Sequence, residues 1–387
     1  MVIGFDGSRS FASRRTGTEN YSYQLLKALA KIDEVNQYIV YLRPDFRQKD
    51  IQEFPNNFKF QISNFKFLWT QAGLALQTFK DKLDVLFVPA HTLPVIRKPG
   101  LKTVVTVHDL GSEYLSSMHQ FKQRLYLSIM QRYQLKTATK IIVVSKATKD
   151  DLIKRVGIEP DKIAVIYEGY DKELFKPIKD EALVNSLIHY DLQPKTYYLF
   201  VGTVHPRKNL KRLIQAFANL VSKGDTFRAY NLVIVGAKGW LSDEIYQMPK
   251  KLGIEEKVKF LGYVPEEDLP ALYSGTIALV FPSLFEGFGL PILEAQACGC
   301  PVITSNLSAM PEVAGYVRVN RNVAGKGAIL VDPYDVEDIV RGIRETLPAG
   351  RQVRGIREKL IKAGFGNIKK FSWEKTARET LAILESV

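Results

Sequence analysis

The first half of the chain alternates short apolar runs, rich in β-branched residues, with longer segments whose apolar side chains recur at helical spacing. Such runs predict buried strands. The predicted strands of this half are residues 2–5, 38–42, 59–62, 85–88, 103–107, 140–144 and 163–166. Helices are predicted between several of them, notably at 19–31 and at 146–155, where Ser145 is a suitable N-cap. Strands that alternate with helices predict a parallel sheet.

This alternation stops between residues 168 and 194, where two prolines and a charged patch indicate an inter-domain connection, placed at 171–194. It then restarts, with predicted strands at 197–201, 231–235, 258–261, 277–281, 301–304 and 328–331, and helices at 210–221, 268–273, 291–297 and 336–347. The chain is therefore expected to fold as two Rossmann-like, doubly wound α/β domains, residues 1–170 and 195–372. Two such domains are expected to face each other across a cleft, with ligands at the carboxyl ends of the strands.

The composition is that of a folded globular protein: 387 residues, 46% hydrophobic, 25% charged and 11% aromatic. Cys298 and Cys300 stand too close together for an ordinary disulfide, so nothing indicates an oxidising compartment. The first residues predict a strand rather than a signal peptide, and no apolar run reaches the roughly 20 residues of a membrane span. We therefore expect a cytoplasmic protein.

The charge is unevenly distributed: 54 Lys and Arg against 41 Asp and Glu give a net charge of +13, and residues 1–150 hold 22 basic and 12 acidic side chains, or +10. Residues 116–149 carry seven basic side chains and no acidic one. Part of this stretch, 121–136, has the pattern of a basic amphipathic helix, which can lie on an anionic membrane. The same pattern also fits an ordinary helix with a solvated basic face. Nucleic acid is disfavoured, because no helix-turn-helix, zinc-finger or aromatic RNA-binding signature occurs.

Two loops of the first half are candidates for ligand contact. Gly17 lies in a loop directly before a predicted helix, where it lets the backbone approach a ligand and where free N–H groups can bind phosphate. His108, followed by Asp109, ends a predicted strand and is expected to point into the cleft, where it can touch a sugar hydroxyl. The alternative is a histidine satisfied by Asp109 or by a backbone carbonyl.

The second half carries two sharper segments. Arg207 and Lys208 stand in a strand-to-helix turn, where two cations suit a diphosphate. The segment from Glu286 to Glu294 follows an apolar strand, and its glycines permit a tight turn before a helix whose free N–H groups near Gly289 and Leu290 can bind phosphate. The two carboxylates can hold hydroxyl pairs of a sugar and a ribose. As plain structure they would only compensate the helix dipole.

Read together, these segments resemble the retaining glycosyltransferases of the GT-B fold, family 4, over essentially the whole chain. The resemblance lies in the Gly17 loop and in VVTVHD, FVGTVHPRKNL, VKFLGYVPEEDLPALY, the E-x7-E element, CGCPVITSNLSAMPEV and FSWEKTA, in this order. It implies that the second domain binds the nucleotide sugar and the first domain the acceptor. It also implies that the final helix, residues 373–387, crosses back onto the first domain.

The same resemblance implies a role for each candidate residue. His108 would contact the donor sugar, Arg207 and Lys208 its diphosphate, Glu286 its hydroxyls and Glu294 the ribose. The remaining donor-binding residues would be Gly17, Gly202, Thr203, Lys259, Leu261, Phe288, Gly289 and Leu290. Of these, Phe288 to Leu290 would hold phosphate through the backbone, and the backbone near Lys259 to Leu261 would border the base.

The chain departs from the family pattern at three places. Thr203 stands where many members carry Arg, which suggests that Arg207 supplies the charge. Glu168 replaces the usual asparagine of the linker motif. Residues 316–324 look like an insertion in a loop beside the donor site.

The expected activity is the retaining, metal-independent transfer of a hexose to a hydroxyl of a glycan or lipid-linked acceptor, in the synthesis of a cell-surface polysaccharide or glycolipid. No D-x-D occurs in the chain, so no metal or other cofactor is expected. The pattern looks most like mannosyltransferases that use GDP-mannose, with UDP-hexoses open as donors. A phosphorylase or epimerase of the same fold and a non-catalytic sugar-binding protein are the rivals. The basic first domain favours an anionic membrane or a lipid-diphosphate acceptor as partner, and hence a peripheral position on the inner face of the membrane.

Overall fold

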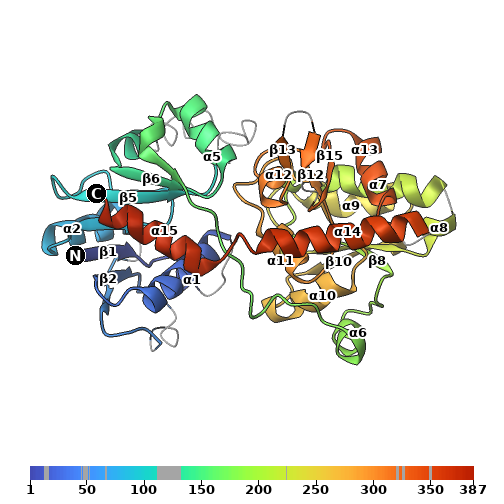
Figure 1. Ribbon diagram of the computed structural model, residues 1–387, viewed down its shortest axis with the longest axis horizontal. Helices are drawn as coiled ribbons and strands as arrows, with labels where there is room; N and C mark the ends of the chain where they lie inside the picture. Colours follow the sequence, from blue (N-terminus) through green and yellow to red (C-terminus); the bar gives the residue numbers. More distant parts are fainter. Residues whose placement is uncertain are drawn as a thin grey trace. The chain divides into compact units, whose positions relative to one another are not determined.

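The chain folds into two compact units in the computed structural model (Figure 1). Residues 1–169 and 371–387 form unit 1, and residues 170–370 form unit 2. The structure describes residues 1–12, 17–44, 46, 51, 53–65, 68–110, 132–223, 225–319, 322–324, 327–347 and 351–387.

Unit 1 is built on a parallel sheet that, among the described residues, has seven strands in the order β3-β2-β1-β4-β5-β6-β7. The strands are β1 (Val2–Asp6), β2 (Gln37–Leu42), β3 (Phe58–Ile62), β4 (Val85–Val88), β5 (Lys102–Val107), β6 (Lys140–Val143) and β7 (Ile163–Val165). The helical segments are α1 (Gly17–Ile32), η2 (Trp69–Leu74), α2 (Ala75–Lys80), α5 (Lys146–Asp151), η3 (Leu152–Val156), η4 (Pro160–Lys162) and α15 (Trp373–Glu385). All seven predicted strands form, because a sheet covered on both faces requires continuous apolar runs.

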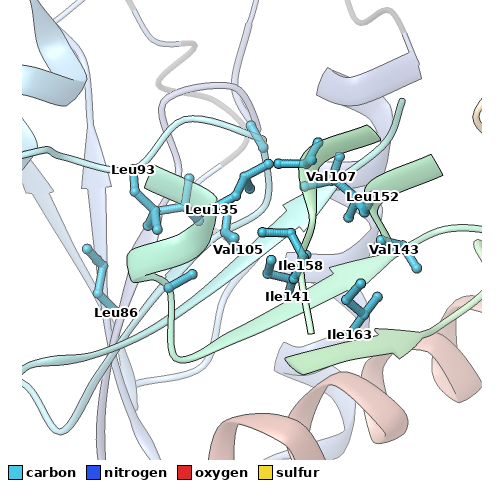
Figure 2. Close-up of a cluster of buried hydrophobic side chains, with 14 of the residues drawn as sticks. Leu86, Leu93, Val105, Val107, Leu135, Ile141, Val143, Leu152, Ile158 and Ile163 are labelled. Atoms are coloured by element: carbon cyan, nitrogen blue, oxygen red, sulfur yellow. The ribbon is translucent and has the colours of Figure 1, made fainter. Parts of the chain in front are cut away.

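The core of unit 1 lies between the sheet and the helices packed on it. Figure 2 shows Val105 and Val107 of β5 among side chains from β6 and from Leu152 of η3. The N-cap predicted at Ser145 is confirmed, since its side chain accepts a hydrogen bond from the N–H of Thr148. Of the predicted basic helix at 121–136, only 132–136 are described; they are helical, and the rest lies outside the described residues.

The C-terminal helix α15 packs against α1 within unit 1, as expected from the family resemblance (Figure 1). The chain leaves unit 1 at Gly169, beside the point where it returns. A Cβ at Gly169 would lie 2.2 Å from the backbone nitrogen of Trp373, so only glycine fits there. The Thr376 hydroxyl fixes the start of α15 by donating to the carbonyl of Tyr167 at 2.7 Å.

Unit 2 contains a second parallel sheet, whose six strands in the described ranges follow the order β10-β9-β8-β11-β12-β15. Its strands are β8 (Tyr197–Val201), β9 (Asn231–Val235), β10 (Val258–Gly262), β11 (Leu279–Phe281), β12 (Val302–Ser305) and β15 (Ile329–Val331). Its helical segments are α6 (Asp180–Ile188), η5 (Pro206–Lys208), α7 (Leu210–Lys223), α8 (Asp225–Arg228), α9 (Asp243–Lys251), η6 (Glu255–Lys257), η7 (Glu266–Asp268), α10 (Leu269–Gly275), α11 (Leu290–Ala297), α12 (Met310–Val313), α13 (Val336–Arg344) and α14 (Arg351–Ile368).

The structure adds to or differs from the sequence-based expectation in four segments of unit 2. Residues 171–194, expected to be a linker, include α6 and belong to unit 2. The helices α9 and α14 were not predicted, since Pro249 interrupts the pattern of α9 and glycines interrupt that of α14. Within the expected insertion at 316–324, β13 (Val317–Val319) and β14 (Asn322–Ala324) form an antiparallel hairpin.

No helix in the described part of the chain combines the length and the apolar character needed to cross a bilayer.

Candidate active site

Three charged side chains meet beyond the carboxyl ends of β8 and β11. Lys208 Nζ donates to Glu286 Oε1 at 2.6 Å, and an Arg207 guanidinium nitrogen lies 3.8 Å from the other carboxylate oxygen. The Lys208 and Glu286 side chains are only 14% and 9% exposed. Burial by itself would raise the pKa of Glu286, but the charges of Lys208 and Arg207 outweigh it and lower that pKa. The site therefore holds an ionised carboxylate between two cations.

The local sequence fixes this turn through its caps. His205 accepts a hydrogen bond from the backbone N–H of Arg207 at 3.1 Å, and Pro206 starts the short helix η5. The Arg207 carbonyl accepts from the N–H of Leu284 at 2.9 Å, which ties η5 to the loop that carries Glu286. The turn is thus held from both sides of the ion pair.

Gly202 lies beside the Lys208 side chain, and its backbone conformation favours glycine. Its φ of 149° is a backbone conformation that L side chains rarely adopt, and a Cβ there would lie 3.5 Å from Lys208 Cε. Lys208 Nζ also lies 5.1 Å from the centre of the Phe281 ring, a cation–π contact. Thr203, the next residue, is exposed.

The loop between β11 and α11 places a helix N-terminus beside this cluster. Gly289 is the N-cap of α11 and has a φ of 108°, which favours glycine. The Ser308 hydroxyl donates to the carbonyl of Glu286 at 2.6 Å and holds the loop in position. Phe288 is buried, and Leu290 is the first residue of the helix. Pro291 has no N–H, and the N–H of Ile292 donates to the carbonyl of Gly289 at 3.0 Å, so the N–H groups of Gly289 and Leu290 are those that can bind an anion.

Glu294 lies one turn into α11 and is held by a tyrosine. The Tyr273 hydroxyl donates to Glu294 Oε2 at 2.7 Å. Burial raises the pKa of Glu294 to about 7, partly offset by the hydrogen bond from Tyr273. This carboxyl therefore changes its charge near neutral pH.

Lys259 and Leu261 lie on β10. The Lys259 side chain forms an ion pair with Asp191, at 2.6 Å, and is 31% exposed. The register of β10 against β9 shifts between Phe260 and Gly262, so the backbone of Leu261 lies outside the regular ladder.

In unit 1, His108 follows the carboxyl end of β5. Its Nδ1 lies 3.4 Å from Glu168 Oε1, its Nε2 lies 3.1 Å from the carbonyl oxygen of Pro89, and its ring stands edge-on to Tyr21 at 4.6 Å between centroids. Gly17 is the first residue of α1, one turn before Tyr21. A Cβ at Gly17 would meet nothing within 4 Å, so space alone does not require glycine there. The preceding residues, 14–16, lie outside the described part of the chain.

The structure thus gathers the predicted residues in two groups, one in each unit. Gly202, Arg207, Lys208, Glu286 and Gly289 cluster at the strand ends of unit 2. Sequence reasoning missed Tyr21, Tyr273 and Ser308, because no motif or spacing marks a residue that holds another from a distant segment. Among the described residues, no three His, Cys, Asp or Glu side chains gather as a metal site would require.

Comparison with known proteins matches both halves of the chain. Residues 191–365 match the profile described as glycosyl transferases group 1, and residues 15–174 match that of glycosyltransferase family 4. The O-antigen chain mannosyltransferase B of Escherichia coli is 30% identical to this chain over 384 residues, which is 95% of each protein.

Solved structures share the fold over the whole chain. A sucrose-phosphate synthase from Thermosynechococcus elongatus superposes with a TM-score of 0.76 at 19% identity, covering 100% of this chain and 98% of its own. Anabaena HepE, solved with UDP and glucose, superposes with a TM-score of 0.72 at 18% identity, covering 100% of this chain and 99% of its own. At these identities the likeness establishes a shared GT-B architecture.

Proposed function

Because this chain belongs to glycosyltransferase family 4, we propose that it transfers mannose from GDP-mannose to a glycan or lipid-linked acceptor, with retention at the anomeric carbon and without a metal ion. The chain is a hexosyltransferase, and the product would be a cell-surface polysaccharide or glycolipid. Support for mannose comes from the relative that is 30% identical over 95% of each protein and is described as an O-antigen chain mannosyltransferase. UDP-glucose and other UDP-hexoses are the alternative donors.

The observation that carries this proposal is the buried cluster of Lys208, Arg207 and Glu286 beside the N-terminus of α11. In the proposed reaction the bond between the anomeric carbon and the diphosphate breaks, and negative charge grows on the leaving group. Lys208, Arg207 and the free N–H groups of α11 would stabilise that charge, an electrostatic contribution of about 3–4 kcal/mol per well-placed donor. These positive groups would neutralise the leaving diphosphate, as a divalent cation does in metal-dependent glycosyltransferases.

The carboxylates would orient the donor. Glu286 would accept hydrogen bonds from hydroxyls of the transferred sugar, and Glu294 from the ribose of the nucleotide. In unit 1, His108 would contact the donor sugar. Front-face departure and attack would give retention without a side-chain nucleophile.

A cavity in unit 1 suits the acceptor. It has a volume of about 410 Å³ and lies beyond the carboxyl ends of β1, β2 and β4, with lining residues that include Asp6, Arg9, Glu19, Trp69 and Gln71. Arg9 pairs with Glu19 at 2.7 Å, and the Trp69 indole donates to Asp6 at 3.0 Å. Hydrogen-bond donors and acceptors around an aromatic side chain suit a carbohydrate.

An exposed apolar face on the helical segment η2–α2 supports contact of unit 1 with a membrane. Leu68, Leu76 and Phe79 are 76%, 44% and 51% exposed, and Ile96 of the neighbouring loop is 71% exposed. Two exposed lysines lie at its end: Lys80 is the last residue of α2, and Lys82 follows the helix. Apolar side chains beside cations suit an anionic bilayer surface.

Liposome co-sedimentation tests the membrane contact. The double variant Leu76→Ser/Phe79→Ser should lose binding to vesicles that contain phosphatidylglycerol, because it removes the exposed apolar face. The matched control, Val184→Ser/Ile188→Ser, removes exposed apolar side chains of α6. Equal binding of the wild type to neutral and anionic vesicles would refute the proposal.

The donor is tested by thermal shift and by turnover with GDP-mannose, UDP-glucose, UDP-N-acetylglucosamine and ADP-glucose. The true donor should raise the Tm by mass action, by an amount that depends on its concentration relative to its Kd. Release of GDP that depends on an acceptor glycan, with an α-linked product from the α-linked donor, is the expected result. Phosphate-dependent turnover, or epimerisation of a UDP-sugar without acceptor, would favour the rival enzyme classes instead. Donor binding with neither transfer nor hydrolysis would favour a non-catalytic sugar-binding protein.

A further inference from the structure

The two ring nitrogens of His108 face a carbonyl oxygen, which can only accept a hydrogen bond, and a carboxyl oxygen, which can only accept when it is ionised. Nε2 lies 3.1 Å from the Pro89 carbonyl oxygen, and Nδ1 lies 3.4 Å from a Glu168 carboxyl oxygen. A neutral imidazole has one N–H and one lone pair. If Glu168 is ionised, a neutral His108 can donate to only one of the two oxygen atoms. At the other contact the lone pair of its ring nitrogen would face the lone pairs of an oxygen.

One additional proton removes this conflict. In one arrangement His108 is an imidazolium beside an ionised carboxylate; in the other, a neutral ring with its proton on Nε2 accepts from a protonated Glu168. Both arrangements hold two protons and have no net charge, and in both Nε2 is a donor because the Pro89 carbonyl cannot donate.

Burial makes the pair necessary. Glu168 is 4% exposed and the His108 side chain 13% exposed, so an unpaired charge on either would lose its hydration. Burial by itself lowers the pKa of His108. The hydrogen bond and charge of Glu168 and the Pro89 carbonyl outweigh that effect and raise it.

Other titratable groups face His108 from three elements. Asp109, on the same loop, helps to raise the pKa of His108. The pKa of His91, an exposed residue after β4, is lowered, and the positive charges of Arg9 and His108 contribute to this. Burial raises the pKa of Tyr21 on α1, so this ring stays neutral. Glu168 is therefore the buried carboxylate that decides the protonation of His108.

We propose that Glu168 is a positioning residue that keeps His108 doubly protonated, with its two ring N–H groups donating to Glu168 and to the Pro89 carbonyl, so that a fixed, positively charged imidazole faces the donor sugar. An amide at this place, as in the family pattern, carries no charge and would leave the ring neutral. This inference rests on the proposed place of His108 beside the donor sugar.

The protonation is measured by NMR on the full-length protein labelled with ¹⁵N and ¹³C histidine. The chain has five histidines, and the His108 signals are assigned by their loss in His108→Gln. Both ring nitrogens of His108 should have protonated shifts at pH 7, and its pKa should fall by about one pH unit or more in Glu168→Gln and in Glu168→Asn. The internal control is His189, which is exposed on the surface of unit 2 and whose signals should be the same in all variants. A His108 pKa that is unchanged in both variants would overturn the proposal.

Turnover provides the second readout. The alkaline limb of kcat/KM should move to lower pH in Glu168→Gln, by about the amount that the His108 pKa moves, whereas a merely structural role would lower the rate equally at all pH values. An alkaline limb that stays in place while the pKa falls would overturn the role in donor recognition. Failure of the wild type to transfer any sugar would instead count against the proposed function, and the NMR titration would still decide the state of the pair.

Discussion

Truncation of Lys208 tests the centre of the proposed mechanism. In Lys208→Ala the hydrogen bond of 2.6 Å to Glu286 and the contact with the Phe281 ring are lost, and Arg207, 3.8 Å from the carboxylate, is left to neutralise it. If Lys208 stabilises the leaving diphosphate, kcat should fall about 10²–10³-fold, or about 3–4 kcal/mol of transition-state stabilisation.

The variant should remain folded. Because Arg207 still compensates the charge of Glu286, the loss of stability should be about 1–3 kcal/mol, or roughly 2–10 °C in the Tm of a unit of this size. Steady-state release of GDP measures the rate, and circular dichroism measures the Tm. The matched control is Lys211→Ala, three residues along the chain, which removes a surface ion pair to Glu244 and should leave both values unchanged.

A double-mutant cycle with Glu286→Gln separates direct from indirect action. If Lys208 contacts the diphosphate itself, Lys208→Ala should still cost at least about tenfold in the Glu286→Gln background. If it acts only by orienting Glu286, the second substitution should cost nothing further. A rate for Lys208→Ala within about fivefold of the wild type would refute the mechanism, since an electrostatic contact of this kind is worth far more.

Three further predictions concern Gly289, Glu294 and Gly169. Gly289→Ala must place a side chain at a φ of 108°, so donor affinity measured by calorimetry should fall at least tenfold while the rest of unit 2 stays folded. Unchanged affinity would show that the N-terminus of α11 does not bind the donor. The pKa of Glu294 is raised to about 7, so the folded state keeps a proton that the unfolded state releases above about pH 4.5. The free energy of unfolding should therefore fall by up to about 3 kcal/mol as the pH rises from 4.5 through 7. Donor affinity should instead rise through pH 7, because the ionised carboxylate accepts better from a ribose. Glu294→Gln should lack both pH dependences, and a wild type with equal donor affinity at pH 6 and 8 would contradict the ribose role. Gly169→Ala should destabilise unit 1 by about 1–3 kcal/mol in urea unfolding, because its Cβ would lie 2.2 Å from the backbone nitrogen of Trp373. The control Gly366→Ala, on the exposed side of α14, should be neutral or slightly stabilising. Equal effects of the two substitutions would contradict the close approach of the chain at Gly169 to the chain at Trp373.

The sequence by itself determined the two sheets and the ends of their strands. Strands buried on both faces require unbroken β-branched and apolar runs, so all thirteen predicted strands form, most within two residues of the expected bounds. Once the strands are known, the residues after their carboxyl ends follow, and that rule, together with the residue types found there, pointed to His108, to Lys208 and to the segment that starts at Glu286. The helices α9 and α14 were not predictable in this way, because proline and glycine interrupt their apolar pattern.

Only the tertiary structure decided which side chains meet. Glu168 is 60 residues from His108, and Lys208 is 78 residues from Glu286, separations that no local period encodes. The apolar pattern fixes the face that each element buries, but the order of the strands decides which loops become neighbours. The protonation of His108, the charge of Glu286 and the raised pKa of Glu294 all depend on these contacts. The free energy of a buried charged group is set by the nearest opposite charge and by the hydration that the group loses on burial.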